Sequence, residues 1–473
     1  FPRCASAAAA APHSAAAFVG PALTPTPAAA RATPSAASTA RWFSADDGSS
    51  SDSSEPDAPP PAVSSKKPLT ASFSTLGDRY ALPPDDAVGR ANDVLTDLEP
   101  GRRVVSFGDV HGDLNALRSF LLTAGILDPH STLDDPVWSG GDAICVQVGD
   151  ILDRGDDELA CLRVLSSLSR QARDAGGALV MLYGNHESLN AAGLFQYANP
   201  GGNVEFESEV GRLIDESLGG ERWRLQFAGN QPSRWAMYEP GGLLAEQCLA
   251  NMKVACVVGR TVFVHAGLTA DHVRKYGGIE GMNSQVKDWI LNSRHDEHNP
   301  EGTYRTVDEV VRSAQNRAQA ISGNMPECLG GGNSGGTPSP VWMRDYSQPS
   351  DGPPKNPVAG TMMDECLEEI SGRIVSAANG ANGDGDANER GVRRMVMGHT
   401  PQRRINAALN GKAIRVDVGA SSGVMGGTPE VLEIIHRGDG DEDVVNILTV
   451  GGERIPLADR QVLDVGIPIE QLL

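Results

Sequence analysis

The sequence predicts an α/β fold built around parallel strands, because strand, polar loop and helix follow one another repeatedly. Three short apolar runs have the length and composition of buried strands: Val104–Phe107, Ile144–Val148 and Leu179–Tyr183. The first two are followed by segments with apolar residues at helical spacing, Leu114–Leu127 and Leu159–Leu168. These helices would cross over between the parallel strands of one βαβαβ unit and pack their apolar faces on the sheet.

Each of these strands ends in a polar loop that contains glycine. The loops are Gly108–Asp113 (GDVHGD), Gly149–Gly155 (GDILDRG) and Gly184–Glu187 (GNHE). Open α/β sheets place their functional sites where such loops meet, at the carboxyl ends of neighbouring parallel strands. Carboxylate, imidazole and amide groups without thiolate suit Mn, Fe or Zn, and a carboxylate such as Asp150 can bridge two cations about 3.5–4 Å apart. The sequence therefore predicts a dimetal site at this edge of the sheet.

The composition narrows the class of protein. The chain has 473 residues, of which 40% are hydrophobic and 21% charged, an ordinary globular composition. Its net charge of −21 argues against a nucleic-acid partner, since a phosphate backbone requires a basic surface. No apolar run reaches the roughly eighteen residues that a membrane-spanning helix needs. The seven cysteines contain no C-x-x-C pair, which argues against a disulfide framework or a zinc ribbon.

The three polar loops resemble the signature blocks of the phosphoprotein phosphatase family, within the calcineurin-like metallophosphoesterases. The sequence around the second loop, Val146–Glu158, is similar more narrowly to the Shewanella-like protein phosphatases. So are Gly398–Gln402 (GHTPQ), Arg415–Gly423 and Pro429–Ile434. The resemblance extends from about residue 103 to about residue 435, with divergent insertions, and does not cover the N-terminal segment.

This resemblance implies the α/β/β/α sandwich of the metallophosphoesterases, in which two central mixed sheets are flanked by helices. We expect Ile414–Val418 and Val431–Ile435 to be strands of the second sheet, and Val445–Val450 to add another. Between Asn190 and Lys253 the pattern is mostly helical, and Glu301–Ile321 indicates an exposed helix.

The resemblance also assigns metal ligands residue by residue. Two further strands, Val262–Val264 and Arg394–Met397, are followed by His265 and by Gly398 and His399. Taken alone, His265 would more often be a hydrogen-bonded core histidine; beside the other blocks we expect a ligand. Two divalent cations are implied, with Mn the first expectation and Fe or Zn the alternatives. The expected ligands are Asp109, His111, Asp150, Asn185, His265 and His399.

The mechanism that the resemblance implies is direct attack on phosphorus by a hydroxide that bridges the two cations. Arg154, Arg344 and Asn185 would bind the substrate phosphate. His186 would protonate the leaving group as the general acid, and Asp153 would orient its imidazole.

The expected function is a metal-dependent phosphoprotein phosphatase that acts on phosphoserine and phosphothreonine or on phosphotyrosine. One alternative is a dinucleoside tetraphosphate hydrolase, or another small-molecule phosphoesterase with the same dimetal site. A second alternative is a non-catalytic docking protein on a phosphatase fold, but the complete set of six expected ligands argues against it. The expected partner is a phosphoprotein substrate. The sequence does not indicate whether a regulatory subunit binds.

The domain organisation follows from composition. Residues 1–67 are rich in Ala, Ser, Pro and Thr, with no acidic residue before Asp46, and then form an acidic, Pro- and Ser-rich linker. An acid-free leader that carries arginines is typical of an organelle transit peptide. The other expected boundaries are a catalytic domain at 68–455, Gly-rich insertions near 328–340 and 380–391, and a C-terminal tail at 456–473.

The leader predicts an organelle address. Arg41–Ser44 resembles the cleavage sites of mitochondrial presequences, and Ala17–Pro21 resembles the plastid signals of some algae, so a mitochondrion is slightly favoured over a plastid. We expect a fluorescent fusion of roughly the first sixty residues, preceded by Met, to enter an organelle. Diffuse cytosolic fluorescence would instead make the leader a plain tail and the protein cytoplasmic.

Overall fold

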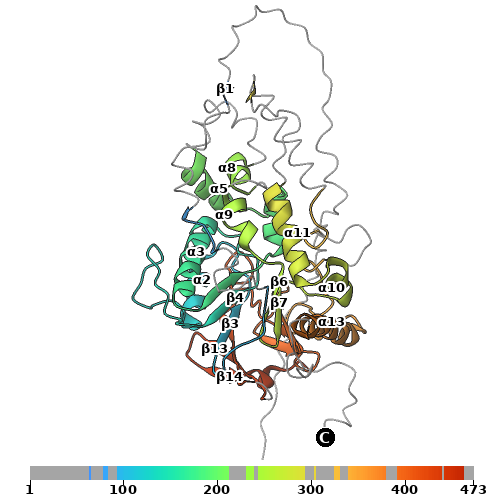
Figure 1. Cartoon of the computed structure of the whole chain (residues 1–473). Coiled ribbons are helices and arrows are strands. Elements are labelled where there is room, and N and C mark those ends of the chain that lie inside the picture. The colour runs from blue at the N-terminus through green and yellow to red at the C-terminus, as the bar shows by residue number, and fades with distance from the viewer. Residues whose placement is uncertain are drawn as a thin grey trace, which may run out of the picture. The chain divides into compact units, whose positions relative to one another are not determined.

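The computed structural model describes most of the chain beyond the leader (Figure 1). The described residues all belong to the unit Asp57–Leu473, and the expected leader lies outside them except for Val63 and Ser64. The Gly-rich insertion expected near 380–391 also lies outside them, apart from Gly391. The described ranges are 63–64, 78–83, 93–211, 231–238, 243–292, 303–304, 324–330, 339–379, 391–438 and 441–462.

The first sheet contains the strands that lead into the three polar loops. Its strands are β3 (Arg103–Phe107), β4 (Ile144–Gln147), β5 (Ala178–Met181), β12 (Glu430–Ile435), β13 (Val444–Thr449) and β14 (Arg454–Pro456). The order across the sheet is β14–β13–β12–β3–β4–β5. β3, β4 and β5 are parallel, with Val105 beside Cys145 and Cys145 beside Leu179, so their following loops meet at one edge.

The second sheet carries the two remaining histidines. Its strands are β2 (Val94–Leu95), β6 (Ala255–Val258), β7 (Thr261–Val264), β9 (Arg394–Met397), β10 (Asn406–Ala408) and β11 (Ala413–Arg415). The order is β10–β11–β9–β7–β6–β2. β7, β9 and β11 are parallel, so His265 and His399 follow neighbouring strands at the same edge. A separate pair joins β1 (Val63–Ser64) to β8 (Thr303–Tyr304).

β12 corrects one expectation, because Val431–Ile435 belongs to the first sheet and not to the second. It lies antiparallel to β3, and β13 and β14 extend the same sheet. The buried carboxylate of Glu433 accepts hydrogen bonds from Arg103 at 2.7 Å and from Arg454 at 3.1 Å. This charged contact joins β12 and β14 to β3, which is distant from both in sequence. Periodicity alone identifies a strand without identifying its neighbour.

Helices cover the outer faces of the two sheets, which confirms the α/β/β/α sandwich (Figure 1). These helices are α2 (Leu114–Thr123), α3 (Glu158–Asp174), α10 (Ala270–Tyr276), α11 (Ile279–Asn292) and α13 (Ala359–Asn379). α2 and α3 lie on the side of the first sheet, and α10, α11 and α13 lie on the side of the second. Stacked rings of Phe107 and Phe120, 5.0 Å apart, join β3 to α2 in the core.

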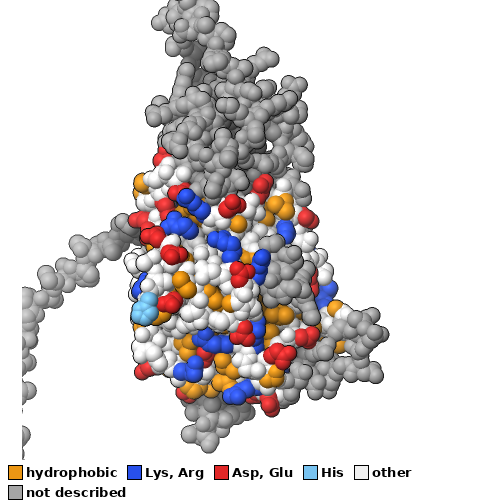
Figure 2. All heavy atoms as spheres, turned by 60° about the vertical axis from the view of Figure 1, so that its left-hand side comes forward, with side chains coloured by type: hydrophobic (Ala, Val, Ile, Leu, Met, Phe, Trp, Pro, Cys, Tyr) orange, Lys and Arg blue, Asp and Glu red, His pale blue; other side chains and the backbone are white. Residues whose placement is uncertain are grey.

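Shorter helices occupy the described part of Asn190–Lys253, as expected. They are α4 (Asn185–Ala191), α5 (Pro200–Phe206), a π-helical turn (Glu207–Gly211), α8 (Pro232–Tyr238), α9 (Leu243–Gln247) and a 3₁₀ turn (Leu249–Asn251). Figure 1 shows α5, α8 and α9 as one group. Figure 2 shows the face on the side of α2 and α3, where acidic and basic side chains are interspersed over the described residues. The acidic charge of the chain is therefore not gathered into one patch on this face.

Several local expectations differ from the structure. Helix α13 was not predicted, although Met363, Cys366, Leu367 and Ile370 form a buried face at helical spacing. Thr303 and Tyr304 form β8 where we expected a helix, and most of the remaining Glu301–Ile321 lies outside the described residues.

The first residues of the expected Gly-rich insertion and of the expected C-terminal tail are part of the packed structure. Cys328 and Leu329, at the start of the Gly-rich insertion expected near 328–340, are buried, and residues 331–338 lie outside the described residues. Past residue 455, β14 ends at Pro456, and a 3₁₀ turn spans Leu457–Arg460 with Leu457 buried. The amide of Val462 then donates to the carbonyl of Ala407 at 2.7 Å. Within the described ranges, no helix combines the length and the hydropathy needed to cross a membrane.

Candidate active site

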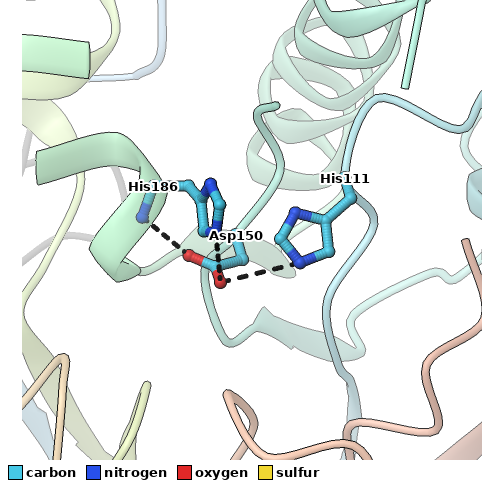
Figure 3. A group of neighbouring side chains, drawn as sticks. All are labelled: His111, Asp150 and His186. Carbon is cyan, nitrogen blue, oxygen red and sulfur yellow. Dashed lines mark hydrogen bonds and ion pairs between the residues drawn. The ribbon is translucent and has the colours of Figure 1, made fainter. Parts of the chain in front are cut away.

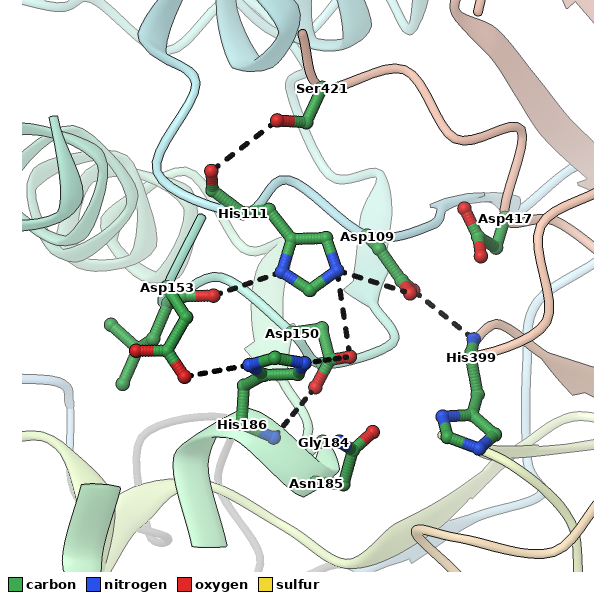
Figure 4. A network of polar contacts seen from close by, with 12 residues as sticks. Asp109, His111, Asp150, Asp153, Gly184, Asn185, His186, His399, Asp417 and Ser421 are labelled. Carbon is green, nitrogen blue, oxygen red and sulfur yellow. Dashed lines mark hydrogen bonds and ion pairs between the residues drawn. The ribbon is translucent and has the colours of Figure 1, made fainter. Parts of the chain in front are cut away.

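The loops that follow β3, β4, β5, β7 and β9 converge at one edge of the two sheets (Figure 4). Five of the six expected metal ligands lie in these loops, Asn185 is the first residue of α4 after the loop that follows β5, and all six side chains are buried. The expected general acid His186 and its partner Asp153 are buried in the same cluster. The structure thus brings together residues that span 290 positions between Asp109 and His399.

The backbone of these loops is strained at the functional residues themselves. Positive φ angles are rare in residues other than Gly. They occur at His111 (48°), Asp150 (57°), Asp153 (65°), Arg154 (67°) and His399 (65°). Such conformations persist only where the surrounding structure enforces them, and they concentrate at active sites.

Glycines allow these loops to approach one another closely. A Cβ atom on Gly184 would lie 2.0 Å from Oδ1 of Asp150, and one on Gly398 would lie 2.5 Å from Oδ1 of Asp109. Neither position has room for a side chain, so the Gly of GNHE and the Gly of GHTPQ are required by contact with the functional carboxylates.

Asp150 lies at the centre of the cluster. Its Oδ2 atom is 3.3 Å from Nε2 of His265, 3.7 Å from Nε2 of His111 and 3.9 Å from Nε2 of His186. Figure 3 shows the imidazoles of His111 and His186 both directed at this oxygen, and their ring centroids are 4.7 Å apart. Oδ1 accepts a hydrogen bond from the backbone amide of His186 at 3.0 Å. Three imidazole nitrogens therefore point at one buried carboxylate oxygen.

Backbone carbonyls fix the orientation of two of these imidazoles. Nδ1 of His111 donates to the carbonyl of Leu152 at 3.0 Å, and Nδ1 of His265 donates to that of Val148 at 2.9 Å. A neutral ring with its proton on Nδ1 presents a lone pair at Nε2. Burial lowers the pKa of His111 to about 4, which favours that neutral form. In this tautomer the Nε2 lone pairs face the carboxylate of Asp150, and a cation between them would be bound by both groups, so this donor set fits bound metal.

The ligand atoms form two groups that share Asp150. One group contains His111 together with His186, the expected general acid, and the other contains His265 and His399; in each, the potential ligand atoms lie within 4.8 Å of one another and of Asp150. Nε2 of His399 is buried without a hydrogen-bond partner among the described residues. This arrangement is compatible with a dimetal site bridged by Asp150.

The remaining two expected ligands border these groups. Oδ2 of Asp109 is 3.9 Å from Nε2 of His111, and its Oδ1 accepts from the backbone amide of His399 at 3.3 Å. Oδ1 of Asn185 is 3.1 Å from Nε2 of His265. Asp109 and Asn185 thus lie on either side of the shared carboxylate, where each could complete one coordination sphere.

His186 has a second polar partner, which distinguishes it from the other imidazoles. Its Nδ1 atom donates to Oδ2 of Asp153 at 2.6 Å. Burial alone would lower the pKa of His186, but the carboxylates of Asp150 and Asp153 outweigh it and raise the pKa. A protonated imidazole held in this way can donate a proton from Nε2, as a general acid requires.

The two expected phosphate-binding arginines lie at the accessible rim of the site. Nη1 of Arg344 donates to Oγ1 of Thr400 at 2.8 Å, next to His399. The guanidinium of Arg154 lies 5.2 Å from the ring centroid of Tyr197, and that ring is 5.0 Å from the ring of His186. Both guanidinium groups can therefore approach an anion that enters beside the imidazole cluster.

Two buried acids at the site were missed by sequence reasoning. Glu187 accepts backbone hydrogen bonds from Asp150 and Ile151, both at 2.8 Å, and from Gly184 at 2.7 Å, and so fixes the Asp150 loop. Asp417 lies close to Asp109, and its pKa is raised to about 6 chiefly by burial. Both residues are part of motifs that we quoted, GNHE and the segment after β11, and each follows a strand in the same way as the expected ligands.

Comparison with known proteins identifies relatives of this chain. Residues 102–321 match the family model for calcineurin-like phosphoesterases. Shewanella-like protein phosphatase 2 of Arabidopsis thaliana is 32% identical over 376 residues, which cover 74% of this chain and 80% of the relative. An uncharacterised protein of Schizosaccharomyces pombe is 27% identical over 350 residues, which cover 71% of this chain and 81% of that protein. A crystal structure of a cold-active protein tyrosine phosphatase covers 80% of this chain and 82% of its own at 19% identity, with a TM-score of 0.48.

The fold and the site define a metallophosphoesterase of the calcineurin-like class, a phosphatase by chemistry. Within that class, the chain belongs to the Shewanella-like protein phosphatases, as its loops indicated.

The shared site predicts that metal binding depends on His265. Replacing His265 with Ala should lower the affinity for Mn²⁺ by more than about tenfold, because even outer-shell partners of metal ligands account for about 10–100-fold. Metal content after dialysis and titration calorimetry would measure the change, with exposed His130→Ala as the matched control. Equal Mn²⁺ binding by His265→Ala and the unmodified chain would exclude His265 as a ligand.

Proposed function

We propose that this chain is a metal-dependent phosphoprotein phosphatase that hydrolyses phosphate monoesters by direct attack of water, with no phosphoenzyme. The observation that carries the proposal is the buried Asp150 carboxylate shared by two histidine-containing groups, with the His186–Asp153 pair beside it. Asp109, His111, Asp150, Asn185, His265 and His399 would hold two divalent cations, Mn first and Fe or Zn as alternatives. When bound, such cations supply positive charge to phosphoryl oxygens and acidify an attacking water.

The chain's own residues supply the remaining steps. Arg154 and Arg344 would bind the phosphoryl oxygens, on which negative charge builds in the transition state. Asn185 would contact the same phosphate from the N-terminus of α4. His186 would donate its Nε2 proton to the departing oxygen, while Asp153 stabilises the protonated ring through Nδ1. These roles place the acid and the positive charge where the leaving group and the phosphoryl group need them.

A protein substrate is favoured by the family, since the Arabidopsis relative is named a protein phosphatase. The competing substrate class is a dinucleoside tetraphosphate or another small phosphate ester, because the same dimetal site and general acid would serve both. A purely docking role is not favoured, because all six expected ligands are present and brought together.

Substrate class is decided by a direct comparison. We expect the full chain with Mn²⁺ to hydrolyse phosphopeptides faster than diadenosine tetraphosphate, and Asn185→Ala to abolish the activity, because it removes a ligand and a phosphate contact. Released phosphate measures both reactions, and Asn115→Ala, at an exposed position of α2, is the matched control. Hydrolysis of the dinucleotide alone would move the function to nucleotide metabolism, and no hydrolysis of either by metal-loaded protein would contradict the proposal.

The general-acid role of His186 predicts a dependence on the leaving group. His186→Ala should lower kcat on a phosphoserine peptide by about 10²–10⁴-fold. The loss on p-nitrophenyl phosphate should be much smaller, because its leaving group is stable without a proton. Steady-state kinetics on both esters measure the difference, with His130→Ala as the control. Equal losses on both substrates would exclude this role.

A further inference from the structure

The guanidinium of Arg234 lies behind the His186–Asp153 pair, on a helix that no sequence motif marks. Arg234 is on α8 and is fully buried. Its Nη2 atom donates to Oδ1 of Asp153 at 2.7 Å, and Nη1 donates to Oε1 of Glu158 at 2.7 Å. Nη2 also contacts Oε2 of Glu158 at 2.5 Å, and Nε donates to Oδ1 of Asn190 at 2.7 Å. One arginine thus joins three residues from three separate segments.

Aromatic rings hold this guanidinium in place. Its central carbon lies 4.8 Å from the ring centroid of Phe206 and 5.6 Å from those of Phe195 and Tyr238. Attraction between a cation and aromatic faces is strongest where water is excluded, as it is here. Aromatic rings surround the guanidinium, and each of its three nitrogens donates a hydrogen bond. The Arg234 side chain is therefore held in one conformation.

The contacts of Asp153 explain why this position matters to the acid. Its Oδ2 accepts from His186, while its Oδ1 accepts from Arg234 at 2.7 Å and from Asn190 at 3.1 Å. Both oxygens are therefore engaged, and rotation of the carboxylate about its bond to Cβ would break at least one contact. The backbone amide of Asp153 also donates to Oε2 of Glu158 at 2.9 Å. Arg234 thus restrains Asp153 directly through its side chain and indirectly through Glu158.

Charge balance leads to the same assignment. Asp153 and Glu158 are both 0% exposed, and two buried carboxylates without compensation are costly. Arg234 supplies a positive charge within hydrogen-bond distance of both carboxylates. Without Arg234, these two buried carboxylates would lose their shared cation, and Oδ1 of Asp153 would keep only the longer hydrogen bond from Asn190.

We propose that Arg234 is a positioning residue for proton donation, which aligns Asp153 and, through Asp153, the His186 imidazole. Arg234 touches neither substrate nor cation in this role and acts only through the pair. The inference rests on the proposed phosphatase function. It goes further by making the acid depend on α8, an element outside the strand-and-loop motifs.

The test is a double-mutant cycle on two esters. The full chain with Mn²⁺ is compared with Arg234→Met, His186→Ala and the double variant, on a phosphoserine peptide and on p-nitrophenyl phosphate. We expect Arg234→Met to lower kcat about tenfold or more on the peptide, up to the His186→Ala loss, and far less on p-nitrophenyl phosphate. In the His186→Ala background the same change should cost little more, because residues that act as a unit are not additive. Arg173→Met, an exposed arginine of α3, is the matched control.

A spectroscopic measurement on metal-free protein tests the alignment without turnover. The Nδ1 proton shared by His186 and Asp153 should give a downfield proton resonance that is absent in His186→Ala. We expect this resonance to shift or broaden in Arg234→Met and to stay unchanged in Arg173→Met. An unchanged resonance, or equal and additive losses of kcat on both esters, would overturn the inference.

Two further variants keep the test decisive where Arg234→Met does not fold. Arg234→Met with Glu158→Gln removes one buried acid together with the cation, and Arg234→Lys keeps the charge but cannot span the same three acceptors. Both should show the leaving-group-selective loss if Arg234 aligns Asp153, and uniform loss would overturn the inference. If the unmodified chain hydrolyses neither ester, the proposed function fails; if it hydrolyses both and these variants lose them uniformly, only this inference fails.

Discussion

The site depends on the buried carboxylate of Asp150, which stays charged only because positively charged groups can surround it. Asp150 is 2% exposed, and its Oδ2 faces the Nε2 atoms of His111, His186 and His265 at 3.3–3.9 Å. Burial alone would raise the pKa of Asp150, but the three imidazoles hold it well below its ordinary range. The carboxylate therefore stays charged, and the surrounding donors are arranged to receive positive charge. A cluster of this kind is expensive to bury without cations and well suited to hold them.

The backbone around Asp150 is held by hydrogen bonds to the buried carboxylate of Glu187. Its φ of 57° is unfavourable for a residue with a side chain. Glu187 offsets that strain by accepting hydrogen bonds from the amides of Asp150, Ile151 and Gly184. Because Glu187 is two residues from Asn185, the GNHE loop positions both a ligand and the loop that presents the bridging carboxylate. The loops that follow β4 and β5 are thus joined by the hydrogen bonds of Glu187.

The expected ligands could be selected from the sequence because each follows a buried strand, and five of the six lie next to glycine, as His399 follows β9 and Gly398. The sequence also predicted two mixed sheets between helices. It did not predict which strands pair, since Val431–Ile435 has the pattern of a strand in either sheet, and the Glu433 contact with Arg103 is visible only in three dimensions. Helix α13 had a readable apolar face, so its omission was a failure of interpretation and not of signal.

No sequence pattern identifies Arg234 as part of the site. Residues that bind metal recur at fixed offsets from strands, whereas Arg234 reaches Asp153 from a position 81 residues away in sequence, on a short helix. The importance of Arg234 follows from the two oxygens of the Asp153 carboxylate, because one of them already accepts a hydrogen bond from His186. The other must be fixed by something rigid, or the imidazole would lose its orientation. The enclosed guanidinium on α8 meets that need, which makes proton donation depend on the helical region as well as on the sheets.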